Sequence, residues 1–270
     1  MSGLEWAIYI AGLGLYAVLS AVLAGRVWGR WGASVSTCRA LCLSILLLHG
    51  LFAALRWAAT SHPPILGTFE ETMAASWAIA LFTLLIDREL RLAPFTIPFA
   101  LLICLYGLSF DVGGKPLVIS EQSLWVYFHA LFAWIAWGFY VLGFASAAAL
   151  LIGRRWEGVV SGEGFFERVL LNCLLNGFIA HTVMFVLGSY YSSRLHGSWW
   201  VWDPVEYLFV VSWFVYAVAI HGRVFYGWKT MRVAVWFVWG FAASLLLYWG
   251  LVYFPWATYH VFDPEMKVHM

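Results

Sequence analysis

The chain alternates long apolar stretches with short polar connections. Eight apolar runs each approach the ~20 residues that a helix needs to cross a bilayer. They lie at about residues 5–24, 39–57, 70–86, 94–110, 123–151, 168–188, 205–221 and 231–251. The fifth run is longer than the others and predicts a helix that tilts or projects from the membrane. This pattern predicts an all-α, polytopic membrane helix bundle with about eight transmembrane helices.

Composition supports a membrane protein and excludes an ordinary soluble domain. Of the 270 residues, 63% are hydrophobic, 19% aromatic and only 11% charged, and the mean hydropathy is +0.83. The net charge of +1 carries no sign of nucleic-acid binding. Neither an internal repeat nor a linker divides the sequence, so we expect one membrane domain over residues 1–270, with the lipid bilayer as its surroundings.

The basic residues predict which side of the membrane each connection faces. Cytoplasmic connections of membrane proteins carry an excess of Lys and Arg. With the N-terminus outside, eleven of the fifteen Lys and Arg residues lie in cytoplasmic connections, namely Arg26, Arg30, Arg39, Arg88, Arg91, Arg154, Arg155, Arg168, Arg223, Lys229 and Arg232. We therefore expect a multi-pass protein of the plasma (inner) membrane, with both termini and residues 189–204 on the outer side.

A tryptophan-rich connection between the sixth and seventh runs is the most distinctive stretch. Residues 196–206 read HGSWWVWDPVE, with tryptophans at 199, 200 and 202. Asp203, Pro204 and Glu206 have the spacing of a helix start with a capping box. An aromatic belt at the membrane surface is the ordinary explanation of such tryptophans. Their density within a polar connection favours instead a flat aromatic surface for a large planar ligand such as a porphyrin.

This stretch resembles the WWD signature of the haem-handling proteins of cytochrome c biogenesis. The signature W-G-x-x-W-x-W-D-x-x-E is matched here at Gly197, Trp200, Trp202, Asp203 and Glu206. The chain departs from it at two places. His196 replaces the first tryptophan, and Val205 stands where a basic residue is common.

A second segment resembles the CcsA/ResC branch of that superfamily, which belongs to System II, rather than its CcmC and CcmF branches. The branch pattern R-W…H-x-P…Y-E is matched by Arg56-Trp57, His62-Pro63-Pro64 and Phe69-Glu70. Phe69 replaces the usual tyrosine, and Gly67-Thr68 replaces an asparagine-containing turn. Thr68 and Glu71 have capping-box spacing, which predicts the start of the third helix there. The count of eight helices also fits this branch.

The resemblance implies three haem ligands. His129 follows Trp125 in the pattern W-x-x-x-H, and His260 follows the last helix, so the two match the outer pair of axial histidines. His221 follows Tyr216 in the pattern Y-x-x-x-x-H and matches the inner haem histidine, a second site. From the residues alone, His129 could equally be a core histidine bonded to a neighbouring helix. His221 could be a residue at a helix C-terminus capped by Gly222.

Two arginines lie near this region in sequence order. Arg56 and Arg194 could bind the haem propionates, because arginine binds carboxylates through two parallel hydrogen bonds. The alternative for Arg56 is a side chain that reaches to the membrane surface from a helix end. His49 and His181 lie mid-helix and are expected to pack or to hydrogen-bond. His62 and His196 lie in outer connections, the latter beside the tryptophans.

The resemblance implies that the protein binds haem b as cargo and carries or presents it on the outer face of the membrane. There the haem becomes covalently attached to c-type apocytochromes, with a CcsB-like membrane partner completing a cytochrome c synthase complex. No general acid or base is evident, so no catalytic residue is assigned. Two alternatives remain: a b-type haem electron-transfer subunit of a quinol-linked complex, or an accessory protein for haem synthesis or respiratory-complex assembly.

Overall fold

The computed structural model describes residues 1–29, 33–65, 67–113, 117, 122–153 and 163–250. All regular secondary structure in these residues is helical: eight α-helices and one π-helical turn, with no strand. The all-α prediction is confirmed. Among the described helices, seven are long and apolar enough to cross a membrane, and α4 (Ala93–Gly107) is shorter. The chain is therefore an integral membrane protein.

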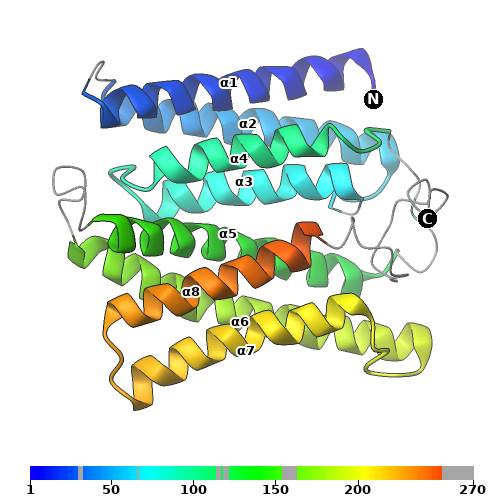
Figure 1. Ribbon diagram of the computed structural model, residues 1–270. Helices are drawn as coiled ribbons and strands as arrows, with labels where there is room; N and C mark the ends of the chain where they lie inside the picture. Colours follow the sequence, from blue (N-terminus) through cyan, green and yellow to red (C-terminus); the bar gives the residue numbers. More distant parts are fainter. Residues whose placement is uncertain (30–32, 66, 114–116, 118–121, 154–162, 251–270) are drawn as a thin grey trace. The chain divides into compact units, whose positions relative to one another are not determined.

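The helices form two compact units, residues 1–123 and 124–270 (Figure 1). The first contains α1 (Gly3–Val27), α2 (Val35–Thr60), α3 (Thr68–Ile86) and α4. The second contains α5 (Leu124–Gly153), α6 (Glu163–His196), α7 (Pro204–Phe225), α8 (Thr230–Leu245) and the π-helical turn η1 (Leu246–Gly250).

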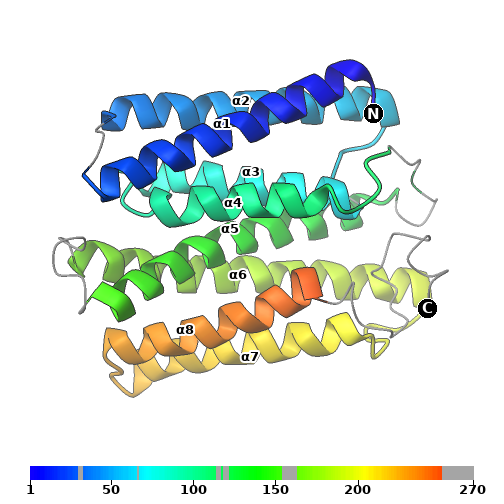
Figure 2. The same ribbon diagram turned by 45° about the horizontal axis from the view of Figure 1, so that its top comes forward.

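The first unit is held by side chains that reach the backbone of a neighbouring helix. Helix α1 packs on α2, and α3 packs on α4, as Figure 2 shows. The fully buried Tyr9 hydroxyl donates to the Cys104 carbonyl at 2.8 Å, and the Tyr16 hydroxyl donates to the Ser76 carbonyl at 3.0 Å. Because lipid offers no hydrogen-bond partners, such bonds satisfy polar groups inside the apolar core.

The second unit is built around the long antiparallel pair α5 and α6, which α7 and α8 cover. Its core is aromatic: Tyr140 of α5 stacks on Tyr216 of α7 with ring centroids 4.1 Å apart. The Tyr140 hydroxyl also lies 3.0 Å from Nδ1 of the buried His181 on α6. Helices α5, α6 and α7 are thus joined at one buried point.

The last described turn of this unit has π-helical geometry. In η1, Tyr248 and Trp249 pack their rings against Trp134 and Trp137 of α5, with centroids 5.2–6.0 Å apart. The Tyr248 hydroxyl donates to the Ala133 carbonyl at 3.2 Å. A π-helical turn contains one residue more than an α-helical path would.

Three expectations about helix ends are wrong. Helix α6 runs to His196 instead of ending near 188, because residues 189–196 contain neither proline nor glycine and the chain turns only at Gly197, which has a positive φ of 72°. Helix α7 continues through Gly222 to Phe225, so Gly222 is not its cap. Helix α3 has Gly67 at its N-cap with no side-chain cap, so Thr68 and Glu71 do not form the expected capping box.

Candidate functional site

The connection between α6 and α7 is a short loop, residues 197–203, which we call the tryptophan loop. The Glu206 carboxylate accepts from the backbone N–H of Val201 at 3.0 Å and of Asp203 at 3.2 Å. The buried Asp203 carboxylate accepts from the N–H of Val205 at 2.8 Å, and Pro204 occupies the first turn. The predicted capping box is confirmed, and it holds the backbone of the tryptophan loop against the start of α7.

The three tryptophans of the loop have different surroundings. Trp199 and Trp202 are 61% and 67% exposed, whereas Trp200 is half-buried and packs edge-on against Phe185 of α6, with centroids 5.8 Å apart. Trp202 has a positive φ of 60°, a conformation that costs a residue with a side chain about 1–2 kcal/mol. The loop therefore presents two indole rings outward and anchors the third.

Aromatic side chains extend this surface onto α5 and α6. Tyr190 of α6 lies 4.5 Å from Trp125 of α5 and 6.1 Å from Trp199, measured between ring centroids. On the other flank Trp202 lies 5.6 Å from Tyr207 of α7. The start of α5, the end of α6 and the start of α7 meet at one end of the second unit (Figure 1). That end is consequently lined by rings from three helices and the loop.

His129 lies at this same end, one helical turn after Trp125. It is part-buried, and its Nδ1 lies 2.8 Å from the Met184 carbonyl of α6. A carbonyl can only accept, so Nδ1 is the donor, and in a neutral imidazole the lone pair is then on Nε2. This is the arrangement in which metal-ligating histidines are held, with one ring N–H donated to a carbonyl and the other nitrogen presented to the metal.

The other predicted ligands lie elsewhere or outside the described residues. His221 lies on α7 at the opposite end of the second unit, where it is exposed and its Nδ1 contacts the Ala217 carbonyl at 2.8 Å. Near that end Arg223 of α7 pairs with Glu167 of α6 at 3.2 Å. His260 lies outside the described residues, so no geometry bears on it. Arg194 and His196 are exposed in the last turn of α6, beside the tryptophan loop.

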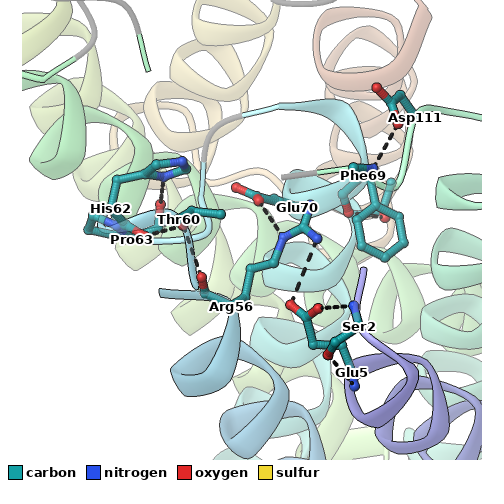
Figure 3. Close-up of polar contacts among 11 residues, drawn as sticks. Ser2, Glu5, Arg56, Thr60, His62, Pro63, Phe69, Glu70 and Asp111 are labelled. Carbon is teal, nitrogen blue, oxygen red and sulfur yellow. Dashed lines mark hydrogen bonds and ion pairs between the residues drawn. The ribbon is translucent and has the colours of Figure 1, made fainter. Parts of the chain in front are cut away.

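Arg56 lies in a buried charged cluster of the first unit. Its Nε donates to Glu70 Oε1 at 2.8 Å, and one terminal nitrogen lies 3.9 Å from Glu5 Oε1 (Figure 3). The three side chains are 2–7% exposed. Glu5 in turn closes the capping box of Ser2. The cluster thus ties the start of α1, the end of α2 and the start of α3 together.

Two histidines predicted to pack or hydrogen-bond are buried. His181 makes the bond to Tyr140 described above, and its ring lies edge-on to Phe209 with centroids 4.5 Å apart. His49 lies between Tyr9 and Tyr16, with no hydrogen-bond partner at either ring nitrogen among the described residues. His62 is buried in the connection between α2 and α3, with Nδ1 3.0 Å from the Pro63 carbonyl.

Sequence reasoning missed several residues that shape these sites. Tyr190 joins two exposed tryptophans, yet it lies in a stretch that hydropathy alone assigned to a connection. Met184 and Gly188 face His129 across the α5–α6 contact. Glu70 pairs with Arg56, whereas spacing predicted a capping role for its neighbour Glu71. The signal available for Glu70 was its place in the branch pattern, where Phe69-Glu70 matches Y-E.

Comparison with known proteins gives consistent matches. The family described as cytochrome c assembly protein matches residues 40–255. The protein named cytochrome c biogenesis protein CcsA from Prochlorococcus marinus strain MIT 9515 is 26% identical over 244 residues, covering 76% of this chain and 78% of that protein. The protein of the same name from strain MIT 9303 is 26% identical over 283 residues, covering 89% of each.

Proposed function

Because the chain belongs to the cytochrome c assembly protein family, we propose that it binds haem as cargo and presents it at the tryptophan loop for attachment to c-type apocytochromes. The haem is haem b, since a haem awaiting attachment still has both vinyl groups. The family supports a role in cytochrome c biogenesis, and the relatives named CcsA are proteins of that process.

The proposal rests on the hydrogen bond between His129 and the Met184 carbonyl. The Nδ1 of His129 donates to this carbonyl, and in a neutral imidazole the lone pair is then on Nε2, the nitrogen through which we propose that the histidine coordinates iron. The ring lies at the end of the unit where Trp125, Tyr190 and Trp199 form a continuous aromatic surface. A porphyrin is flat and largely apolar, so it gains contact area on such rings. The donor and the surface together fit a haem.

The remaining ligands follow the family resemblance. His260 is the proposed second axial ligand, opposite His129 on the iron, and a pair of imidazoles makes a six-coordinate site. His221 is the proposed ligand of a second haem, at the opposite end of the unit from the tryptophan loop. Arg194, exposed in the last turn of α6, is the proposed partner of a propionate.

Attachment requires positioning more than proton transfer. Two cysteine thiols of an apocytochrome add across the two haem vinyl groups. Each vinyl double bond takes up the sulfur and the hydrogen of one thiol. A protein that holds the haem face and edge in place supplies the proximity that such a reaction needs. We therefore assign no catalytic residue and propose that the chain acts within a cytochrome c synthase complex with a CcsB-like membrane partner.

The distribution of basic residues supports the proposed side of the membrane. In the first unit, Arg39 in the first turns of α2 donates to the carbonyls of Leu84 in α3 and of Arg88, two residues after its end. In the second, Arg223 and Arg232 flank the connection between α7 and α8. We propose that these ends face the cytoplasm and that the tryptophan loop faces outward. Cysteines introduced at Leu195 and Tyr226, both exposed, should react from the outside and from the inside respectively; the reverse would refute this orientation.

The decisive experiment replaces His129 with alanine in the purified full chain. The variant should lose low-spin six-coordinate haem absorption, and imidazole should restore it, because a free imidazole can occupy the vacated ligand position. His181→Ala, which removes a histidine bonded to Tyr140, should show no such rescue. An unchanged spectrum in His129→Ala would reject this ligand assignment.

Haem release separates the proposal from the alternatives. A protein that presents haem should transfer it to an apocytochrome, yielding haem that stays bound after denaturation. A b-type electron carrier should retain its haem through many turnovers. Deleting the gene and staining membranes for covalently bound haem would separate both from an accessory protein: loss of all c-type cytochromes is the expected result.

A further inference from the structure

The ring of His129 packs against α6 at Gly188, where there is no room for a side chain. A Cβ atom built on Gly188 would lie 2.7 Å from Nδ1 and 2.8 Å from Cε1 of His129. Separations under 3.0 Å are essentially unknown for real Cβ atoms. With any residue other than glycine at 188, either the histidine ring or helix α6 would have to move.

The same position controls access to the hydrogen-bond acceptor of His129. In an α-helix the carbonyl of residue 184 points toward the N–H of residue 188, four residues on. A donor from another helix that reaches the Met184 carbonyl must therefore approach beside residue 188. The His129 Nδ1 does so at 2.8 Å. The missing side chain of Gly188 leaves this carbonyl open to a second donor.

We propose that Gly188 is a positioning residue for haem ligation. It seats the His129 imidazole against α6, so that the Met184 carbonyl holds the proton on Nδ1 and the Nε2 lone pair keeps one direction. This inference rests on the proposed role of His129 as an axial ligand. Hydrogen bonds to the second nitrogen of a ligating histidine fix its orientation and raise its basicity. Because the acceptor is a backbone atom, Gly188 is the residue through which mutation can reach it.

Two other glycines show that close contact with a ring does not by itself make a glycine a positioning residue. On the same helix, a Cβ at Gly177 would lie 2.6 Å from Cε1 of Tyr140. In the first unit, a Cβ at Gly12 would lie 2.6 Å from Nε2 of His49, but neither nitrogen of that ring has a hydrogen-bond partner among the described residues. Gly188 differs from both because it seats an imidazole whose Nδ1 bonds to the carbonyl of the same helix.

The first test is Gly188→Ala in the full chain purified with haem. We expect haem affinity to fall by about 10–100-fold, the usual effect of losing a partner of a metal ligand, together with a weaker low-spin spectrum. Gly177→Ala introduces equal crowding between α5 and α6, away from His129, and should leave the spectrum unchanged. Gly50→Ala, whose Cβ would meet nothing within 4 Å, controls for the substitution itself. A similar loss in Gly177→Ala would overturn the proposal, since general packing would then explain both.

A second test does not depend on the folding of Gly188→Ala. In His129→Ala, added imidazole can donate to the Met184 carbonyl while it binds iron, whereas 1-methylimidazole cannot donate. Imidazole should therefore bind about threefold to tenfold more tightly, the worth of one hydrogen bond. In the double variant His129→Ala, Gly188→Ala this preference should disappear.

The outcomes separate the two proposals. If His129→Ala leaves the haem spectrum unchanged, the proposed ligand is wrong. If His129→Ala loses the spectrum, but Gly188→Ala matches the parent protein and the two imidazoles bind equally, only the role of Gly188 is refuted.

Discussion

The two units bury their polar side chains in different ways. The first unit buries full charges, with Arg56 between Glu70 and Glu5. Among the described residues of the second unit, the only charged side chain that is buried is Asp203, which caps α7; the other buried polar side chains are neutral. Both units bury imidazole and hydroxyl groups, and the first unit adds ion pairs at its helix ends.

The difference bears on which residues are available to a ligand. A buried guanidinium bonded to carboxylates is already satisfied, and removing it for a new partner would expose buried charge to an apolar core. A neutral imidazole with one nitrogen bonded keeps a lone pair for iron. We infer that Arg56 stabilises the first unit and that Arg194 is the better candidate for a propionate.

The largest effect is expected from breaking the charged cluster. Arg56→Met leaves Glu70 and Glu5 buried without their cation, which should lower the free energy of unfolding by about 3–5 kcal/mol. The double variant Arg56→Met, Glu70→Met, which removes the closer pair and leaves only Glu5, should recover part of that loss. Thermal unfolding in detergent measures both. Loss of haem from Arg56→Met at an unchanged unfolding temperature would show instead that Arg56 binds the ligand.

An intermediate effect is expected from the rings of the tryptophan loop. Replacing Trp200 and Trp202 with phenylalanine keeps aromatic area, whereas replacing both with alanine removes it and also removes the contact of Trp200 with Phe185. The alanine pair should weaken haem binding about tenfold more than the phenylalanine pair, because aromatic contacts are worth about 0.5–1.5 kcal/mol each. Haem titration of the three proteins checks this. Equal affinity in the alanine pair and the parent would exclude the aromatic surface.

The smallest effect concerns Asp203, which lies in the stretch that resembles the WWD signature. Asparagine caps helices about as well as aspartate, so Asp203→Asn should change stability by only a few tenths of a kcal/mol, whereas Asp203→Ala should cost about 0.5–2 kcal/mol. Haem affinity, measured on the same proteins, should stay near the parent value in Asp203→Asn, which keeps the cap, and should fall in Asp203→Ala, which loses it. A weaker affinity in Asp203→Asn than in the parent, at equal stability, would assign the carboxylate to the ligand.

Much of the fold could be predicted because hydropathy alone marks membrane helices. All eight predicted runs correspond to helices, and the capping box of Asp203 and Glu206 follows from local spacing. The end of α6 was missed because residues 189–196 are helical but polar. Hydropathy detects that they are polar and does not detect that they form a helix. The cap at Thr68 failed for a related reason: spacing permits a capping box, but Gly67 takes the N-cap position.

The candidate site was less predictable because it depends on contacts distant in sequence. The tryptophans and His129 could be named from local patterns. The bond of His129 to the Met184 carbonyl, 55 residues away, could not, because a backbone acceptor leaves no signature in the sequence. The contact of Arg56 with Glu5 could not be predicted either. Glu5 lies at a helix start, where its capping box with Ser2 already explains it.

The π-helical turn at Leu246–Gly250 makes the end of α8 tolerant of a change in chain length. An α-helix advances each residue by about 100° of rotation, whereas a π-helical turn spreads one extra residue over the same path. Deleting Leu246 would remove that extra residue, so the turn can relax to an α-helix while the indole of Trp249 stays close to Trp134 and Trp137, with which it now packs. A deletion of one residue should therefore be less damaging here than elsewhere in α8, where it would turn every following side chain by about 100°.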